Sequence, residues 1–241
     1  PVDPVDPVDP VDPVDPVDPV DPVDPVDPVD SVLLSEAFDS GPLTGWTAVN
    51  GTNWAVADGA LTYSQNDGRP AVMYLYDESS DWSDCRITFE MGTFGDDDPM
   101  GVVFYYQDAD NHLGYFSTRS HDGGNRSVIY MELNGERTIL ASEQGGGLAL
   151  DQWHSVTVEV TTGGLIVVND GQNTISATVP STFTEGQFGF YVEYNKGAKF
   201  DNLVVEQLSV DPVDPVDPVD PVDPVDPVDP VDPVDPVAPV D

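Results

Sequence analysis

The chain has 241 residues and a formal charge of −38, from 45 acidic residues against 7 lysines and arginines. This acidity argues against binding to a nucleic-acid backbone, which needs clustered Lys and Arg, and against anionic membranes. The sequence contains no run of about 20 apolar residues, which a membrane-spanning helix would need. The single cysteine, Cys85, excludes an internal disulfide. Divalent cations are the partners that such a charge favours.

Both ends of the chain repeat the triplet Pro-Val-Asp. The triplet runs without error from Pro1 to Asp30 and returns from Asp211 to Asp241, where Ala238 replaces one Asp. Proline fixes φ near −65° and restricts the residue before it, which steers the triplet toward polyproline II. We therefore predict polyproline II arms at residues 1–31 and 210–241, flanking one domain at residues 32–209. Because the chain begins and ends within a repeat, we expect it to be part of a longer polypeptide.

The spacing of the triplet limits what an arm can bind. Polyproline II has three residues per turn and rises about 3.1 Å per residue, so successive Asp lie about 9 Å apart on one edge. Calcium ligands lie about 2.3–2.6 Å from the ion, so two such Asp cannot share one ion. Two roles remain open for the arms: an inert spacer, or a rod that self-associates with other rods into a fibre.

The central residues predict short strands joined by turns. Apolar residues alternate over 102–107, 156–160 and 188–194. Asn134-Gly135 predicts a type I′ hairpin, Gly163-Gly164 predicts a second hairpin, and Asp170-Gly171 follows soon after. No convincing helix of ten residues occurs. This pattern predicts an all-β sandwich or jelly roll.

The stretch GTFGDDDPMGVVFYYQDADNHLGYF, from Gly92 to Phe116, resembles the signature of the thrombospondin C-terminal domain. The resemblance implies a calcium-binding jelly roll of the concanavalin A-like, laminin-G-like superfamily. It does not extend to the Asp-rich calcium repeats of the thrombospondin protein, because Pro-Val-Asp arms replace them. Four other stretches are similar to the wider superfamily: Phe38–Trp46, Asn53–Leu61, Gln152–Val160 and Gly186–Glu206.

Three groups of aspartates are candidate calcium ligands, because calcium takes oxygen ligands and offsets crowded carboxylates. They are Asp96, Asp97 and Asp98; then Asp108 and Asp110, one strand later; and Asp39 and Asp201, near the two ends of the domain. A strand over 101–107 would hold the first two groups apart. Terminal strands of jelly rolls often pair, so one ion could join the third group. Ordinary solvated turns are the alternative for each group.

Four residues are candidates for contacting a glycan, because they alternate with apolar neighbours in predicted strands: Tyr105, Arg119, Tyr191 and Tyr194. The four tryptophans are expected in the core instead. A catalytic role is not expected. Retaining glycosidases need two carboxylates about 5–5.5 Å apart, and no strand here carries such a pair. The three histidines show no metal-binding spacing.

These features predict a non-catalytic, calcium-binding, lectin-like module carried on stiff acidic rods, at the cell surface or outside the cell. It would be a repeating unit of a bacterial surface adhesin or extracellular fibre, with a glycan or a surface protein as its partner. The alternative is a carbohydrate-binding module of a secreted polysaccharide-degrading enzyme, in which the repeats act as linkers.

Overall fold

The structure, a computed structural model, describes residues 31–41, 43–66, 72–79, 82–120, 123–161 and 164–208. Residues Val29–Val210 form one compact unit. The Pro-Val-Asp repeats at residues 1–30 and 211–241, for which polyproline II was predicted, lie outside the described residues. Within the described ranges, no helix is long and apolar enough to span a membrane.

The described part of the chain is all β, as predicted, with fifteen strands and no helix. The strands are β1 (Ser31–Glu36), β2 (Trp46–Val49), β3 (Trp54–Ala57), β4 (Ala60–Tyr63), β5 (Val72–Tyr76), β6 (Cys85–Thr93), β7 (Met100–Asp108), β8 (Asn111–Thr118), β9 (Arg126–Leu133), β10 (Glu136–Gln144), β11 (His154–Val160), β12 (Leu165–Asn169), β13 (Thr174–Thr178), β14 (Gln187–Val192) and β15 (Ala198–Gln207).

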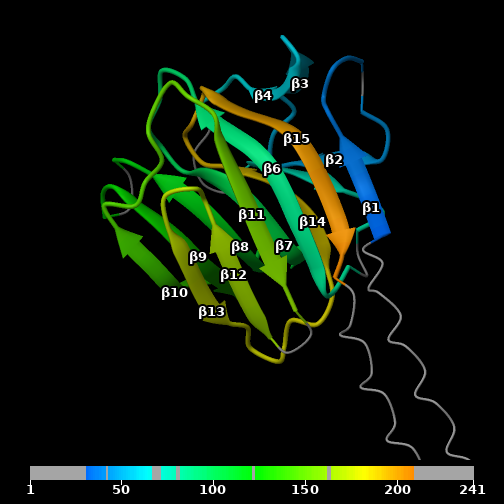
Figure 1. The fold of residues 1–241 in the computed structure, drawn as a ribbon, viewed down its shortest axis with the longest axis vertical. Coiled ribbons are helices and arrows are strands. Elements are labelled where there is room, and N and C mark those ends of the chain that lie inside the picture. Colours follow the sequence, from blue (N-terminus) through cyan, green and yellow to red (C-terminus); the bar gives the residue numbers. More distant parts are fainter. Residues whose placement is uncertain are drawn as a thin grey trace, which may run out of the picture. The chain divides into compact units, whose positions relative to one another are not determined.

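The strands form two antiparallel sheets that pack face to face (Figure 1). The seven-stranded sheet has the order β10-β9-β8-β7-β14-β5-β2. The eight-stranded sheet has the order β13-β12-β11-β6-β15-β4-β3, and β1 also pairs with β15. This arrangement confirms the predicted jelly-roll sandwich, because consecutive hairpins are joined in each sheet to strands from distant parts of the chain, such as β14 beside β5 and β15 beside β4.

The first and last described strands are direct neighbours. In β1, Ser31 lies opposite Gln207 and Glu36 lies opposite Leu203. The other half of β15 pairs with β4, at Lys199 and Phe200, so β1 and β4 share one side of the same long strand. The expected pairing of the terminal strands is therefore confirmed, and the chain enters and leaves the sandwich at neighbouring positions (Figure 1).

Aromatic rings from both sheets fill the space between them. Phe190 on β14 lies 4.4 Å from Phe200 on β15 and 5.8 Å from Phe89 on β6, measured between ring centroids. Trp46 on β2 stacks on Phe190 at 5.7 Å, and Phe38 meets the same ring edge to face at 5.8 Å. Full burial of each such side chain contributes on the order of 1.5–3 kcal/mol. These rings therefore hold the sheets together.

The outer side of the seven-stranded sheet is buried as well. Successive side chains of a strand point to opposite faces, and the residues that alternate with the main core form a second apolar cluster: Met73, Leu75, Val103, Tyr106, Phe116, Val128, Tyr130 and Tyr191. Each is at most 8% exposed. This sheet therefore carries apolar side chains on both faces, unlike a sheet with one solvated face.

A bulge in β7 changes the predicted alternation. Simple alternation places Tyr105 on the same face as Val103, but the structure packs Tyr105 into the main core beside Phe104. The reason is a positive φ of 51° at Tyr105, where the pairing with β8 also shifts register. Tyr106 then joins Val103 in the outer cluster. The left-handed conformation of Tyr105 thus places both Tyr105 and Tyr106 on the faces opposite to those that simple alternation predicts.

The turns predicted at Asn134-Gly135 and Asp170-Gly171 occur at those positions, whereas the turn predicted at Gly163-Gly164 includes Gly163, which lies outside the described residues. Asn134 and Gly135 join β9 to β10 with φ values of 54° and 76°, which confirms a turn with two positive φ angles. β11 pairs with β12, and β12 pairs with β13 across Asp170 and Gly171. Cys85, expected to be a small buried residue of a strand, begins β6 at 2% exposure. Burial, and then the charge of Asp84, raises the pKa of its thiol to about 12.

Asp170, which follows β12 in one sheet, binds side chains of the other sheet. Its carboxylate accepts hydrogen bonds from the Tyr115 hydroxyl at 2.9 Å and the Ser127 hydroxyl at 2.7 Å. The second oxygen accepts the backbone N–H groups of Gln172 and Asn173 at 3.0 and 2.7 Å. Asp170 is 1% exposed, and these bonds satisfy it without water. It therefore ties the β12–β13 turn to β8 and β9.

We predict that Asp170→Asn destabilises the domain by about 2–3 kcal/mol, because the amide turns one acceptor into a donor that faces the hydroxyls and N–H groups. For a domain of this size, the midpoint of thermal unfolding should fall by roughly 5–10 °C. Asp58→Asn is the matched control, since Asp58 is exposed in a turn with a φ of 55° that Asn tolerates. Equal midpoints for the two variants would disprove the cross-sheet role of Asp170.

Candidate functional site

The three consecutive aspartates lie together in the loop between β6 and β7. One carboxylate oxygen from each of Asp96, Asp97 and Asp98 lies within 4.8 Å of the other two, and all three residues are half-buried. Two oxygens that bind one calcium ion at about 2.3–2.6 Å can be at most about 5 Å apart. The spacing of this group, hereafter the acidic loop, therefore fits a single calcium ion.

Hydrogen bonds hold the backbone of the acidic loop. The Thr93 hydroxyl donates to the carbonyl of Asp96 at 2.7 Å, and the Asn195 side chain donates to the carbonyl of Asp98 at 2.7 Å. The backbone N–H of Arg119 donates to the carbonyl of Asp97 at 2.9 Å. Loops after β6, β8 and β14 thus meet at one end of the sandwich, and the loop conformation is fixed without a metal ion.

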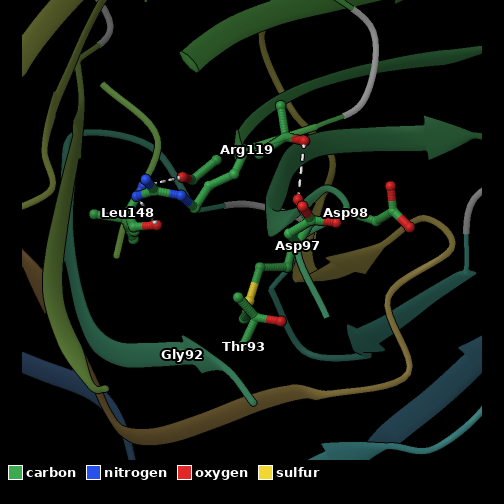
Figure 2. Close-up of a pocket in the computed structure, with 9 residues that line it drawn as sticks. Gly92, Thr93, Asp97, Asp98, Arg119 and Leu148 are labelled. Carbon is green, nitrogen blue, oxygen red and sulfur yellow. Dashed lines mark hydrogen bonds between the residues drawn. The ribbon is translucent and has the colours of Figure 1, made fainter. Parts of the chain in front are cut away.

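The acidic loop borders a small pocket with an empty volume of about 240 Å³, open solvent included. Figure 2 shows Asp97 and Asp98 on one side of this pocket, with Arg119 directed toward Leu148. The Arg119 guanidinium donates to the carbonyls of Gly147 and Leu148, both at 3.3 Å. Arg119, a predicted glycan contact, therefore holds a neighbouring loop.

Asp108 and Asp110 lie at the other end of β7, as the predicted strand requires. The carboxylate of Asp108 accepts the backbone N–H of Asp110 at 2.8 Å and the Asn111 side chain at 2.9 Å. This pattern is that of a turn in which Asp caps its own backbone. Among the described residues, the acidic loop is the one group of three possible metal ligands that lie together. The Asp108 carboxylate is therefore used within its own turn.

Asp39 follows β1, and Asp201 lies on β15, the strand that pairs with β1. Asp201 also lies opposite Glu90 on the neighbouring β6. Burial raises the pKa of Asp201, and the charges of Glu90 and Asp39 raise it further. The hydrogen bond from the backbone N–H of Asn202 lowers this pKa and offsets part of the increase. A raised carboxyl pKa means that the folded state loses stability as the pH rises through that value. A cation beside these carboxylates would offset the loss.

The predicted glycan tyrosines lie in three different surroundings. Tyr105 packs in the core between the sheets, and burial raises its pKa to about 12. Tyr194 follows β14, half-buried, with a φ of 60°. Tyr191 lies in the outer cluster on the second face of the seven-stranded sheet. The structure thus does not bring Tyr105, Arg119, Tyr191 and Tyr194 together.

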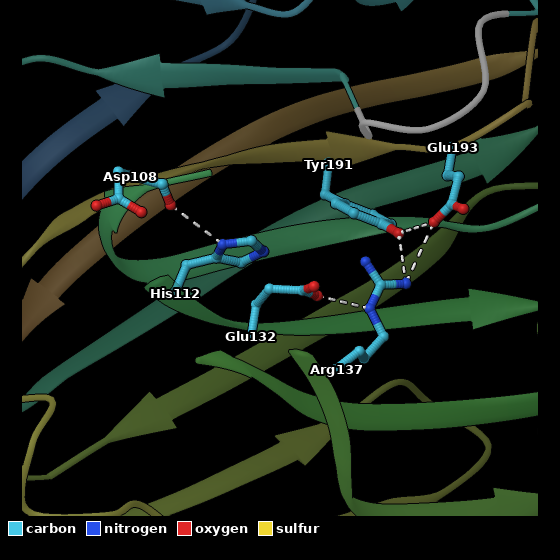
Figure 3. A network of polar contacts seen from close by, with 6 residues as sticks. All are labelled: Asp108, His112, Glu132, Arg137, Tyr191 and Glu193. Carbon is cyan, nitrogen blue, oxygen red and sulfur yellow. Dashed lines mark hydrogen bonds and ion pairs between the residues drawn. The ribbon is translucent and has the colours of Figure 1, made fainter. Parts of the chain in front are cut away.

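The outer face carries a polar group that the sequence does not reveal, shown in Figure 3. Arg137 on β10 donates from Nε to Glu132 at 2.9 Å and from Nη1 to Glu193 at 3.3 Å. The Tyr191 hydroxyl donates to the same carboxylate of Glu193. The Arg137 guanidinium also lies 4.6 Å from the centre of the Tyr130 ring. We call these five residues the outer-face cluster.

Two members of the outer-face cluster reach solvent. The side chains of Arg137 and Glu132 are 15% and 13% exposed, whereas that of Glu193 is fully buried. The carboxylates of Glu132 and Glu193 both face the Arg137 guanidinium, so its one positive charge offsets part of their two negative charges. The arrangement can present a planar donor fork and a carboxylate to a ligand that carries several hydroxyl groups.

His112 lies beside the outer-face cluster. Its ring meets Tyr130 edge to face at 5.7 Å, and its Nδ1 lies 3.3 Å from the carbonyl of Asp108. Burial lowers the pKa of His112, so its imidazole is neutral at neutral pH. Its Nε2 is buried and has no hydrogen-bond partner among the described residues.

Sequence spacing misses the outer-face cluster because its members come from different strands. Glu132 and Arg137 lie on either side of the Asn134-Gly135 turn, and that hairpin predicts that they face each other across it. Tyr191 belongs to β14 and Glu193 directly follows it, and β14 pairs with β7 and β5 rather than with β9. Strand order, which the sequence does not specify, places them near Arg137.

Solved structures with the same fold include proteins that carry carbohydrate-related names. The carbohydrate-binding module CBM66 from Bacillus subtilis is 25% identical, covers 68% of this chain and 96% of its own, and has a TM-score of 0.56. A Bacillus subtilis protein of unknown function with a galectin-like fold is 12% identical, with coverages of 73% and 96% and a TM-score of 0.61. The exoplasmic/lumenal domain of VIP36, solved with Ca²⁺ and Man2, is 12% identical, with coverages of 75% and 89% and a TM-score of 0.55.

A search of the curated proteins found no match. The family model of the 3-keto-alpha-glucoside-1,2-lyase-like domain matches residues 34–206, which include half of β1, all of β2 to β14 and most of β15. This range is well over half of the chain, and the chain therefore belongs to the family of 3-keto-alpha-glucoside-1,2-lyase-like domains.

Proposed function

We propose that residues 32–209 are a non-catalytic, lectin-like module that binds carbohydrate outside the cell. The observation that carries this proposal is the 25% identity to the module CBM66, which extends over 96% of that module in the same fold. VIP36, solved with Ca²⁺ and mannose-containing ligands, supports it through the fold alone. The acidity of the chain favours an uncharged glycan over an anionic one.

The outer-face cluster is the main candidate site for the glycan. It offers the partly exposed guanidinium of Arg137 and carboxylate of Glu132, which the buried rings of Tyr130 and Tyr191 support on one face of a rigid sheet. Charged hydrogen bonds of this kind recognise hydroxyl groups, and a sheet holds them with little loss of entropy on binding. Of the glycan residues predicted from sequence, Tyr191 is the one that belongs to this cluster.

We predict that neutral polysaccharides in affinity gels retain the Glu132→Gln variant roughly tenfold more weakly than the wild type. The amide loses the charge that strengthens hydrogen bonds to hydroxyl groups, while Arg137 keeps its contact with Glu193. The measurement is migration through native gels that contain an α-glucan, a β-glucan, a mannan, a fructan or a xylan.

Glu159→Gln is the matched control. Glu159 accepts a hydrogen bond from Arg86 at 2.8 Å on the eight-stranded sheet, so it loses a comparable ion pair away from the outer-face cluster. Glu159→Gln should migrate as the wild type does. If none of the five gels retained the wild type, carbohydrate binding would be contradicted. If both variants were retained equally, the outer-face cluster would not be the binding site.

A catalytic role is the second candidate, because the family carries the name of a lyase. A 1,2-elimination of a 3-keto-glucoside removes the C2 proton, which the neighbouring ketone acidifies; the C2–H electron pair forms a C1=C2 double bond, the C1–O bond breaks, and the leaving oxygen takes a proton. The imidazole of His112, whose pKa is lowered by burial, has the chemistry of a general base, and side chains around its enclosed Nε2 would have to move before a substrate reached it. Release of the aglycone from a 3-keto-α-glucoside by wild type, lost in His112→Gln, would overturn the non-catalytic proposal.

Calcium is the proposed ion of this module. The spacing of the acidic loop supports one ion there, with ligands from Asp96, Asp97 and Asp98. A second ion at Asp39 and Asp201 stays a prediction from the sequence, because these two carboxylates do not form a group of three possible ligands among the described residues. Asp108 and Asp110 are weaker candidates than the acidic loop, because no third carboxylate lies beside them among the described residues. The similarity of Gly92–Phe116 to the thrombospondin C-terminal domain stays a prediction that agrees with calcium binding.

We predict that removing calcium with EDTA lowers the thermal midpoint of the wild type by about 5–10 °C, since an ion held by the folded state stabilises it by mass action. Asp97→Asn should remove most of this calcium-dependent difference. Asp108→Asn is the control and should keep it. An identical response to EDTA in all three proteins, or no response in the wild type, would contradict an ion at the acidic loop.

The setting of the module is also a proposal, because the repeats lie outside the described residues. In an adhesin or fibre, calcium would bridge Asp edges of neighbouring arms and the chains would self-associate. In a secreted enzyme, the arms would be linkers and the chains would remain apart. Sedimentation of the full chain at rising calcium concentration separates the two: calcium-dependent polymers support the fibre, and a monomer throughout supports the linker.

A further inference from the structure

An exposed aromatic surface lies apart from the outer-face cluster, at the ends of β6 and β11. Trp153 and Leu150 are 39% and 38% exposed, in contrast to Trp46, which is buried in the core. The ring of Phe94 meets Trp153 edge to face at 5.5 Å between centroids. The ammonium of Lys199 lies 5.2 Å from the centre of the Phe94 ring. We call Phe94, Leu150, Trp153 and Lys199 the rim platform.

The rim platform is held rigidly by its backbone. The N–H of Asp151 donates to the carbonyl of Thr93 at 2.9 Å, and the N–H of Gly95 donates to the Asp151 carboxylate at 3.0 Å. A Cβ on Gly92 would lie 2.5 Å from the carbonyl oxygen of Gln152, so β6 and this loop touch with no space for a side chain. The aromatic rings are therefore positioned before any ligand arrives, which lowers the entropic cost of binding.

The charges beside the rim platform select among ligands. Asp151 belongs to the same loop as Leu150 and Trp153, and its carboxylate accepts the N–H of Gly95 next to Phe94. Carboxylates accept hydrogen bonds from hydroxyl groups and repel anions. An exposed Trp offers an apolar ring that can cover the C–H face of a sugar, as amphipathic aromatic residues do at binding surfaces. The combination fits an uncharged sugar better than an acidic one.

We infer that the rim platform is a second carbohydrate subsite, which takes one pyranose ring of a neutral polysaccharide against Trp153. The inference rests on the proposed carbohydrate-binding function and adds a site that is separate from the outer-face cluster. Hydroxyl groups of the bound ring would face the Asp151 carboxylate. A polysaccharide that reaches both sites would gain affinity from two weak contacts, because the second contact becomes intramolecular once the first has formed.

The test measures the retention of the full-length chain, with calcium present, in native gels that contain the neutral polysaccharide found to bind the wild type. Trp153→Ala should weaken retention at least about tenfold, because truncating an aromatic anchor removes most of its contact area. Trp153→Phe should recover part of the loss. Leu165→Ala is the matched control: Leu165 is 45% exposed on β12 of the same sheet, away from the platform, and its loss should change nothing.

The outcomes separate this inference from the proposed function. If the wild type binds no polysaccharide, both are wrong. If the wild type binds and Trp153→Ala binds equally well, the rim platform alone is wrong. If polygalacturonate, an anionic polysaccharide, is retained more strongly than neutral chains through Trp153, the charge argument is wrong. A double variant Glu132→Gln, Trp153→Ala whose effect multiplies the two single effects would support two separate sites.

Discussion

The contact of Phe190 with the rings around it sets the distance between the two sheets. Phe190 touches rings from β2, β6 and β15, so it joins strands that are far apart in the chain. Close packing of this kind leaves few alternative arrangements for the strands. The polar features described above depend on it, because each lies where a loop or a strand end is fixed by the sandwich.

The charges of the domain are placed by two different physical rules. At the ends of the sandwich, carboxylates such as Asp97 lie partly in solvent, where water screens their repulsion. On the outer face, Glu193 is fully buried and is paired with Arg137 and Tyr191. Burying a charge is costly unless a partner and hydrogen bonds compensate for it. The first group can therefore exchange ligands with solvent, while the second is part of the folded structure.

Local features could be predicted from the sequence, and long-range ones could not. The acidic loop follows from three adjacent aspartates, and the β9–β10 turn follows from Asn134-Gly135, because both depend on neighbouring residues. The face of the sheet on which Tyr105 lies could not be predicted, since the positive φ of Tyr105 reverses the alternation of side chains along β7. The contact of Arg137 with Glu193 depends on strand order, and the exposure of Trp153 depends on what packs around it, so neither has a signal in the sequence.

The pairing of β1 with β15 decides how the domain would respond to tension along the polypeptide. Ser31 and Gln207 are opposite each other, so a pull on the chain at these two residues acts across the ladder rather than along it. Backbone hydrogen bonds of an antiparallel pair lie perpendicular to the strands and would then break one after another, as in peeling. Such loading meets less resistance than shear, in which all bonds share the force. The sandwich would therefore release β1 first and act as an extensible element under load.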